Sequence, residues 1–452
     1  MNVSPYLFIS PDVYENEDGK KRVPIFDSFN ARVLTVSEPL ADSFRVGDLS
    51  PIDPAALHSF EEAGLVTQPA IDLRDDVYSN MDQAAADAKS PTFVLLPASY
   101  CNMGCDYCGQ VHVRGGLSRN HRAAVLNRVI KRVESPQVER VKINWFGAEP
   151  LMGFATIRSM SQPLVEAADR ANKPYHAMIV TNGVLLDHRK LAALVDECRI
   201  TEYHITIDGP AAIHDSHRPL KAGGGSFERI VGFLSEIARD ERYRHVNFVI
   251  RTNIDVKNSD YVSDYLKLMA ERGFAGASNF EFNLAPVHPW GNDVSQLQIA
   301  MREYAEAEGK WLREMRQLGL AFRLIPSATM PRTCMATHRD SEVISSSGAI
   351  FSCTEYPLAP KHEQESVLIR VDELSPDKPR PEGEFDSWSE EVRAGQYPCA
   401  TCWFLPACGG SCPKLWKEGV PACPSPKFNM NERLDIEMSS RGWRRLSRAA
   451  WT

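Results

Sequence analysis

The chain has 452 residues, which is enough for two or three domains with large cores. Its formal net charge of −8 argues against a general nucleic-acid binder and against attachment to an anionic membrane surface. No apolar run approaches the ~20 residues of a membrane span, and the first residues lack the basic and apolar regions of a secretory signal. We therefore expect a cytoplasmic protein that binds neither nucleic acid nor membrane.

Residues 1–90 are expected to form a small N-terminal α+β unit. Short strands are predicted near 6–9 and 31–36, and a helix is predicted over 54–63, ending at Gly64, a usual C-cap residue. Residues 75–90 are rich in Asp, Ala and Ser and are predicted to be a linker.

From residue 92 the pattern changes to strands that alternate with amphipathic helices. Strands are predicted at 92–96, 140–145, 176–180, 203–207, 247–252 and 279–284, and helices at 118–134, 155–172, 187–197, 226–240, 259–272 and 294–318. Six such repeats predict parallel βαβ units. The expected fold class is therefore α/β, with a partial (β/α)6 TIM-like barrel over residues 91–320 and its chemistry in the loops that follow the strands.

The C-terminal part of the chain has a different character. Residues 325–430 are rich in Cys, Gly, Pro and Ser and poor in periodic apolar runs, so this unit is expected to need metal to fold. Residues 431–452 are predicted to be a basic amphipathic helix. A helix docked on the body with its basic face in solvent is favoured over a membrane or nucleic-acid role.

The eleven cysteines are grouped rather than scattered. Three lie within 101–108, seven lie between 334 and 423, and Cys198 stands alone near the end of a predicted helix. Disulfides are not expected in a cytoplasmic protein, so the grouping indicates metal binding. Cys198 is predicted to be a buried core thiol.

The first chemical motif is CNMGCDYCGQVH, which places Cys101, Cys105 and Cys108 on one loop directly after the first barrel strand. Three thiolates are one short of a tetrahedral zinc site or a fully ligated iron–sulfur cluster. A zinc site completed by His112 and a chance cysteine loop are the alternatives. The loop resembles the cluster loop of the radical S-adenosylmethionine (SAM) enzymes.

That resemblance implies a 4Fe–4S cluster whose free iron is chelated by the amino and carboxylate groups of SAM. Tyr107 matches the aromatic position of the motif, whose backbone contacts the adenine. Gln110 and His112 either face the SAM or substrate pocket or cap the loop, and both readings stay open.

The second motif is WFGAEP, residues 145–150, at the end of the second strand. It resembles the GGEP motif of radical SAM enzymes, which holds the amino group of SAM, and its matching positions are Gly147, Ala148, Glu149 and Pro150. A glutamate accepts hydrogen bonds from an ammonium group, and small residues let the backbone approach closely. Ala148 replaces the second glycine, which the site tolerates if its φ is negative.

The third and fourth strands also end in motifs. Thr181, Asn182 and Gly183 form a turn signal that resembles the TNG motif lining the SAM pocket. The stretch HITIDGPAAIHDSHR resembles the S-x-D-G-x4-H-D-x2-R pattern of peptide-modifying radical SAM enzymes. By that resemblance, Thr206 and Asp208 contact the carboxylate or ribose end of SAM.

Four residues of this stretch are expected in a loop over the barrel mouth: Asp208, His214, Asp215 and Arg218. Direct catalysis and a salt-bridged loop that only orders the lid are equally favoured for the last three. Arg251 and Asn253, after the fifth strand, are weaker candidates for SAM contacts.

The seven later cysteines are the most specific motif. Their spacing, Cys334 then Cys353, followed by a C-x2-C-x5-C-x3-C run and a last cysteine, resembles the SPASM domain of radical SAM enzymes that act on peptides and proteins. The resemblance assigns one auxiliary 4Fe–4S cluster to Cys399, Cys402, Cys408 and Cys423, and another to Cys334, Cys353 and Cys412. The second cluster lacks a fourth cysteine here, so an open or non-cysteine position is predicted on it. Zinc is the alternative metal.

These resemblances cover residues 92–425 and imply three 4Fe–4S clusters, SAM and an external one-electron reductant of the flavodoxin or ferredoxin type. The predicted function is a maturase that abstracts hydrogen from a side chain of a ribosomally made precursor peptide and forms a C–C, C–O or C–S crosslink. Residues 1–90 resemble a winged-helix unit that binds a leader peptide at a sheet edge. Alternatives are an anaerobic sulfatase maturase, a peptide epimerase and a non-catalytic iron–sulfur or zinc scaffold.

Overall fold

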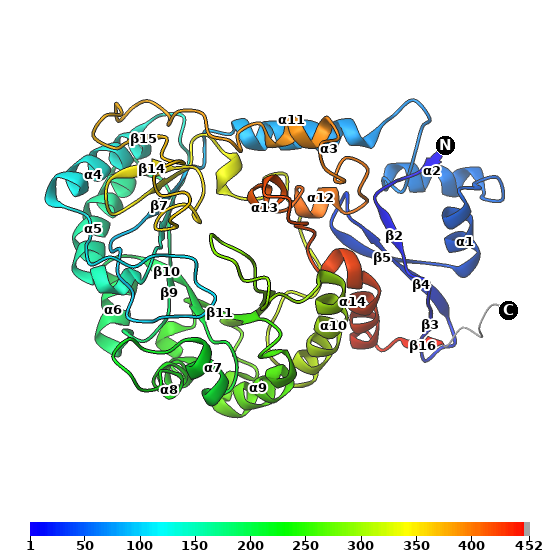
Figure 1. The fold of residues 1–452 in the computed structure, drawn as a ribbon. Helices are drawn as coiled ribbons and strands as arrows, with labels where there is room; N and C mark the ends of the chain where they lie inside the picture. The colour runs from blue at the N-terminus through cyan, green and yellow to red at the C-terminus, as the bar shows by residue number, and fades with distance from the viewer. Residues whose placement is uncertain (447–452) are drawn as a thin grey trace.

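A mostly parallel sheet forms the centre of the molecule in the computed structural model, which describes residues 1–446 (Figure 1). Six parallel strands lie in the order β12-β11-β10-β9-β8-β7. They are β7 (Thr92–Leu95), β8 (Val141–Trp145), β9 (Tyr175–Thr181), β10 (Ile200–Thr206), β11 (Asn247–Ile254) and β12 (Phe280–Pro286). All six were predicted, and the α/β class with a barrel-type parallel sheet is confirmed.

Helices cover the outer face of this sheet, as Figure 1 shows. They are α4 (Arg119–Glu134), α5 (Phe154–Arg170), α6 (His188–Asp196), α8 (Phe227–Ala238), α9 (Val262–Met269) and α10 (Met301–Gln317). Strand residues such as Phe93, Ile143 and Ile205 are fully buried and share one core with the inner faces of these helices. Burial alternates along most of these strands, as at Val141, Ile143 and Trp145 of β8, because one face of the sheet packs against the helices. The last helix begins at Met301, later than the predicted start at residue 294.

The cysteine-rich unit extends the same sheet. β13 (Glu342–Ile344) pairs in parallel with β7, and the sheet continues antiparallel through β14 (Ala349–Phe351) and β15 (Ile369–Arg370). Val343 and Phe351 pack with Val94 and Leu96 in a shared core. The apolar side chains of the unit are therefore buried together with those of the first barrel strand. Its helices are short: α11 (Trp388–Arg393), α12 (Leu405–Cys408) and α13 (Pro413–Lys417).

The N-terminal unit is an antiparallel sheet with helices. β4 (Lys21–Asp27) pairs with β2 (Leu7–Ile9), β3 (Val13–Glu15) and β5 (Arg32–Val36), while β1 (Asn2–Val3) pairs with β6 (Val66–Thr67). The helices α1 (Glu38–Val46) and α2 (Pro54–Glu62) complete it. The two predicted strands and the helix before Gly64 agree with β2, β5 and α2.

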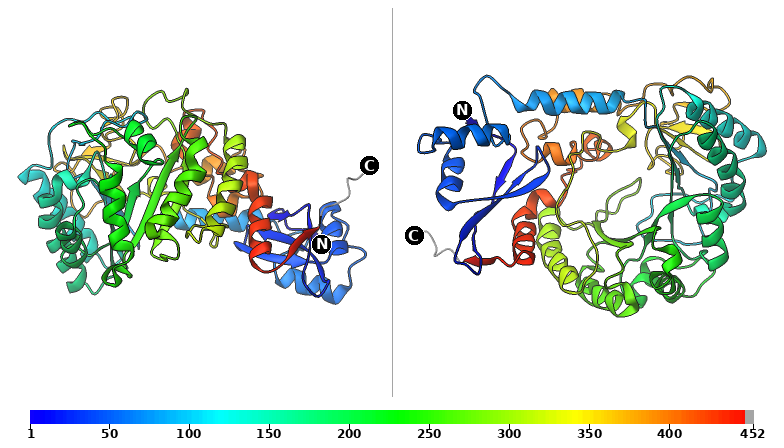
Figure 2. Two further views of the ribbon diagram at one scale, coloured as in Figure 1. Left: turned by 90° about the horizontal axis from the view of Figure 1, so that it is seen from below. Right: turned by 180° about the vertical axis from the view of Figure 1, so that it is seen from behind.

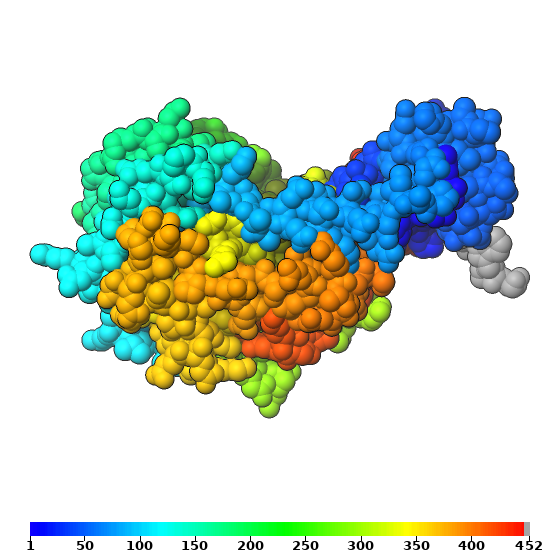
Figure 3. Space-filling view, turned by 90° about the horizontal axis from the view of Figure 1, so that it is seen from above, coloured from blue at the N-terminus to red at the C-terminus, as the bar shows by residue number. Residues whose placement is uncertain are grey.

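The predicted linker at 75–90 is wrong for most of its length, because α3 covers Leu73–Ala86. Asp72 caps this helix by accepting the Arg74 N–H. Val77, Tyr78 and Met81 are buried against Trp388 and Val392 of α11. Figure 3 shows α3 running across the face of the cysteine-rich unit toward the N-terminal unit. The polar composition of the segment concealed one apolar stripe.

The predicted C-terminal helix also needs correction. α14 covers Pro426–Ser440 and is followed by a turn with Gly442 at φ 79° and then by β16 (Arg444–Leu446). β16 pairs antiparallel with β3, so the end of the described chain lies against the N-terminal unit (Figure 2). Residues 447–452 of the predicted helix lie outside the described residues. Within residues 1–446, no helix is long and apolar enough to cross a membrane.

Candidate active site

The cysteine loop after β7 lines a cavity of about 190 Å³ at the carboxyl ends of the barrel strands, which we call the mouth cavity. Cys101, Cys105 and Cys108 all face it. Burial raises the pKa of Cys105 to about 12, with Cys108 and Cys101 near enough to contribute and Arg218 opposing them. Asn182 donates from Nδ2 to Cys101 Sγ at 3.7 Å, which ties this loop to the loop after β9.

The walls of the mouth cavity come from the predicted strand-end motifs. Gly147, Ala148, Thr181, Asn182 and Thr206 all line it. Gly147 has φ 117°, and a Cβ on it would lie 2.8 Å from Cγ of Leu96, so only glycine fits there. Ala148 is not among the described non-glycine residues with positive φ, so the replacement of the second glycine costs no backbone strain.

Glu149 is buried beneath this wall rather than on it. Its Oε1 accepts the Leu151 N–H at 2.9 Å and the Thr181 hydroxyl at 2.7 Å, and its Oε2 accepts the Asn182 N–H at 2.8 Å. The carboxylate therefore holds the turn after β9 against the turn after β8. Pro150 is likewise buried and begins a 3₁₀ turn, Pro150–Gly153.

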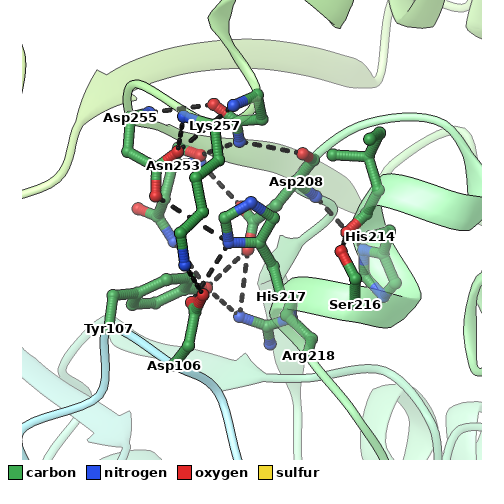
Figure 4. A network of polar contacts seen from close by, with 12 residues as sticks. Asp106, Tyr107, Asp208, His214, Ser216, His217, Arg218, Asn253, Asp255 and Lys257 are labelled. Carbon is green, nitrogen blue, oxygen red and sulfur yellow. Dashed lines mark hydrogen bonds and ion pairs between the residues drawn. The ribbon is translucent and has the colours of Figure 1, made fainter. Parts of the chain in front are cut away.

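A polar network joins the cysteine loop to two more strand ends (Figure 4). The Tyr107 hydroxyl donates to Asp208 Oδ2 at 2.5 Å, accepts from Asn253 Nδ2 at 3.0 Å and contacts the Arg218 guanidinium. Asp208 Oδ1 accepts the Asn253 N–H at 2.8 Å. Arg218 lines the mouth cavity, whereas Asp208 and Asn253 lie behind it. Tyr107 thus fixes the loop through its side chain.

His214 and Asp215 lie away from the mouth cavity, and the predicted loop that holds them is a helix. α7 covers Ala211–His217 and follows Pro210, whose φ of −60° suits a helix start. His214 Nδ1 accepts the Asp208 N–H at 3.1 Å, and Asp215 accepts the N–H groups of Ser226 and Phe227 at the start of α8. Burial lowers the pKa of His214 to about 3, with nearby Arg218 and His217 acting in the same direction. These contacts favour the lid-ordering interpretation for both residues.

Of the remaining predicted site residues, two line the mouth cavity and Arg251 lies outside its lining. Gln110 and His112 line the mouth cavity. Burial lowers the pKa of His112 to about 4, and Lys221, 3.1 Å from its Nδ1, acts in the same direction. Arg251 donates from Nε to Asn253 Oδ1 at 2.8 Å and lies outside the lining.

Five lining residues were not among the predicted site residues: Gly109, Phe146, Val180, Trp290 and Glu355. Trp290 lies in the loop after β12, and Glu355 lies two residues after Cys353. For these two, the position after the sixth barrel strand and after a predicted cluster cysteine was the available signal.

The comparisons with known proteins agree with this geometry. The family model of the radical SAM superfamily matches residues 95–268, which include the cysteine loop and all the strand-end motifs described above. This chain carries a radical SAM domain. It is therefore an enzyme whose cofactors include SAM and a 4Fe–4S cluster.

Relatives resemble the chain beyond that domain. The serine-type anaerobic sulfatase-maturating enzyme of Bacteroides thetaiotaomicron is 21% identical over 364 residues, covering 72% of this chain and 83% of that protein. The solved structure of anSMEcpe with bound AdoMet and the Cp18Cys peptide has a TM-score of 0.57 and 20% identity, covering 78% of this chain and 97% of that chain. The solved structure of Streptococcus suis SuiB bound to precursor peptide SuiA has a TM-score of 0.48 and 13% identity, covering 94% of this chain and 99% of that chain.

The radical SAM site of this chain fits a cluster and SAM by its donors. Three thiols, which are soft ligands suited to iron–sulfur clusters, line one wall of the mouth cavity. Backbone without large side chains at Gly147 and Ala148 forms another wall, where a ligand can approach closely. Cys101, Cys105 and Cys108 would hold the cluster, and the turns fixed by Glu149 would receive SAM.

The seven later cysteines lie in two sets. The pKa of Cys408 is raised to about 12, chiefly by burial and also by the nearby thiols of the other members of the four-cysteine set: Cys399, Cys402 and Cys423. The pKa of Cys353 is raised by burial, then by Glu355, and also by the other members of the three-cysteine set: Cys334 and Cys412. Within each set, the thiols therefore lie near enough to influence one another.

Both sets contribute to the lining of one cavity of about 560 Å³: Cys408 from the four-cysteine set, and Cys334 and Cys412 from the three-cysteine set. Within residues 1–446, no three Cys, His, Asp or Glu side chains converge as they do around a single metal ion.

Proposed function

We propose that this radical SAM enzyme is a peptide maturase that forms an intramolecular crosslink in a ribosomally made precursor. The observation that carries the proposal is the placement of a seven-cysteine unit on the edge strand of the barrel, with Glu355 of that unit lining the mouth cavity. Groups able to accept an electron therefore lie beside the site where a substrate radical forms. Crosslinking needs this, because the radical must lose one further electron to give a closed-shell product.

SAM supplies a 5′-deoxyadenosyl radical that abstracts hydrogen from an unactivated carbon of the substrate. The chain itself orients the reactants. Asn182 and Thr181 are held by Glu149, and Tyr107 is held by Asp208 and Asn253, so both walls of the mouth cavity are fixed before a ligand arrives. Trp290 and Phe146 add apolar surface that excludes water from a reactive intermediate.

Two auxiliary 4Fe–4S clusters are part of the proposal. The four-cysteine set would ligate one cluster completely, and the three-cysteine set would leave one position of the other without a cysteine. A neighbouring side chain, water or substrate would fill that position. An external reductant of the flavodoxin or ferredoxin type would supply the electron that starts each turnover.

Recognition of the precursor is assigned to residues 1–90. Within the described residues, β5 pairs with β4 alone, so its outer edge offers unpaired backbone groups. An extended leader peptide can add to such an edge as a further strand. The neighbouring core of Phe44, Leu65 and Val66 makes the unit firm enough to act as a template.

A sulfatase maturase, which oxidises a Cys or Ser to formylglycine, is the second candidate. It is favoured by the match to the Bacteroides thetaiotaomicron enzyme over 72% of this chain. Against it, β1–β6 with helices α1 and α2 form an additional sheet-containing unit before the barrel. An epimerase is the third candidate, and the same product analysis identifies it.

The test is co-expression with short precursors encoded beside this chain's gene, followed by mass spectrometry. A loss of two hydrogens with a new linkage in fragment spectra supports crosslinking. An unchanged mass with an inverted residue indicates epimerisation, and an aldehyde that reacts with a hydrazide indicates formylglycine. A protein with no iron and no 5′-deoxyadenosine production would be a scaffold and would contradict the whole proposal.

A further inference from the structure

One lysine stands out among the groups around the cysteine sulfurs. Lys427 donates from Nζ to Sγ of Cys423 at 3.4 Å. Lys427 is thus a charged donor to a cysteine sulfur, whereas the Met103 N–H and the Asn182 amide, which donate to Cys101, are neutral. Charge-assisted hydrogen bonds are roughly twice as strong as neutral ones.

The position of Lys427 is not explained by the helix that carries it. The residue lies in the first turn of α14, where the positive end of the helix dipole disfavours a cation. No carboxylate forms an ion pair with it among the salt bridges of the described chain, whereas the nearby Lys414 pairs with Glu418 at 2.6 Å and Lys417 pairs with Glu391 at 2.7 Å. The sulfur of Cys423 is therefore the hydrogen-bond acceptor of its ammonium group.

The three-cysteine set has neighbours of both signs, Glu355 and Lys414. Lys414 is paired with Glu418 at 2.6 Å, and Glu355 accepts a hydrogen bond from the Thr354 hydroxyl at 3.2 Å. Of the side chains of Glu355, Lys414 and Lys427, that of Lys427 is the one that donates a hydrogen bond to a cysteine sulfur.

We propose that Lys427 is a tuning residue that raises the reduction potential of the iron–sulfur cluster on the four-cysteine set. Reduction adds one electron to the cluster, and hydrogen bonds and nearby positive charge stabilise the more negative, reduced form. The inference rests on the proposed function, because it requires that the four-cysteine set hold a cluster.

The test is a potentiometric titration with dithionite, monitored by electron paramagnetic resonance. Full-length protein is used in which Cys101, Cys105 and Cys108 are replaced by Ala, so that auxiliary clusters alone give the signals. Lys427→Gln is compared with Lys427→Arg, which keeps the charged donor, and with Lys417→Gln, which removes an equal charge that contacts no sulfur.

Lys427→Gln is expected to shift one of two transitions to lower potential by a tenfold change in the reduction equilibrium or more, which is about 59 mV for one electron. Lys427→Arg should retain most of the potential, and Lys417→Gln should leave both transitions in place. An unchanged potential in Lys427→Gln, or an equal shift in Lys417→Gln, would overturn the assignment. A parent protein with one auxiliary signal and about four irons instead of about eight would overturn the proposed cluster content and this inference with it.

A second measurement needs no substitution at Lys427. Protein labelled with [ζ-15N]lysine is reduced, and pulsed electron paramagnetic resonance is recorded at the four-cysteine cluster. A 15N coupling is expected, because the ammonium nitrogen is hydrogen-bonded to a cluster thiolate. A spectrum without it would overturn the contact, even if Lys427→Gln failed to fold or to bind iron.

Discussion

Replacing Glu149 by Gln separates two roles that this glutamate can have. If its carboxylate served only to accept hydrogen bonds from the amino group of SAM, the protein without SAM would not be affected. The structure instead places it in a buried position, accepting hydrogen bonds from Leu151, Thr181 and Asn182. A glutamine keeps one acceptor oxygen and turns an NH2 group toward at least one of these donors.

The cost follows from those contacts. A hydrogen bond to a charged group contributes about 1.5–3 kcal/mol, and a buried donor left without a partner costs about 1–3 kcal/mol. We therefore expect Glu149→Gln to lower the free energy of unfolding by about 2–4 kcal/mol in the absence of SAM. At about 2–4 °C per kcal/mol for a unit of barrel size, the melting temperature should fall by about 4–16 °C.

The assay is anaerobic differential scanning fluorimetry without SAM, followed by equilibrium dialysis with labelled SAM. Glu139→Gln is the matched control, because Glu139 is exposed and pairs on the surface with Lys89. A normal melting temperature combined with weak SAM binding would refute the positioning role and restore the direct contact predicted from the motif.

Four further predictions test the site and its surroundings. Replacing Cys101, Cys105 and Cys108 by Ala should abolish SAM cleavage, and continued formation of 5′-deoxyadenosine would contradict the cluster site. Replacing Cys399 or Cys402 should leave SAM cleavage in soluble protein but give no matured peptide, so full product would show that the four-cysteine set is dispensable. Tyr107→Phe removes the hydroxyl that Asp208, Asn253 and Arg218 share, and it should speed iron loss to a chelator, whereas Tyr100→Phe should not. The pKa of His214 is about 3 in the folded protein and 6.5 in the unfolded chain, so protonation favours the unfolded chain. The stability that neutral His214 contributes is fully present above pH 6.5 and is lost as the pH falls toward 3. Between pH 7 and pH 5, the free energy of unfolding should fall by about 2 kcal/mol. Denaturant titrations at both pH values should show a smaller fall for His214→Asn than for the unchanged protein; equal falls would contradict the neutral buried histidine.

The sequence by itself determined the strands of the barrel and the cysteine sets. Runs such as 141–145 carry an apolar residue at every second position because one face of the strand packs in the core, and that alternation is visible in the residues alone. The cysteines are equally visible, since thiol chemistry requires the residue type and the spacing limits which thiols meet. Ala148, Thr206 and Arg218 were placed correctly at the mouth cavity, because strand ends in a parallel sheet meet at one edge.

Only the tertiary structure decided what the polar side chains do. Glu149, Asp208 and His214 have the residue types of catalytic groups, but burial and backbone donors engage them in holding turns together. Their partners come from other strands or helices, and sequence spacing does not report contacts of that kind. The helix α3, the strand β16 and the ammonium of Lys427 were overlooked for the same reason. Each is defined by a contact with another segment: α3 packs against α11, β16 pairs with β3, and Lys427 donates to Cys423. The sequence assigned Cys423 to a cluster, but it did not show that an ammonium group lies beside its sulfur.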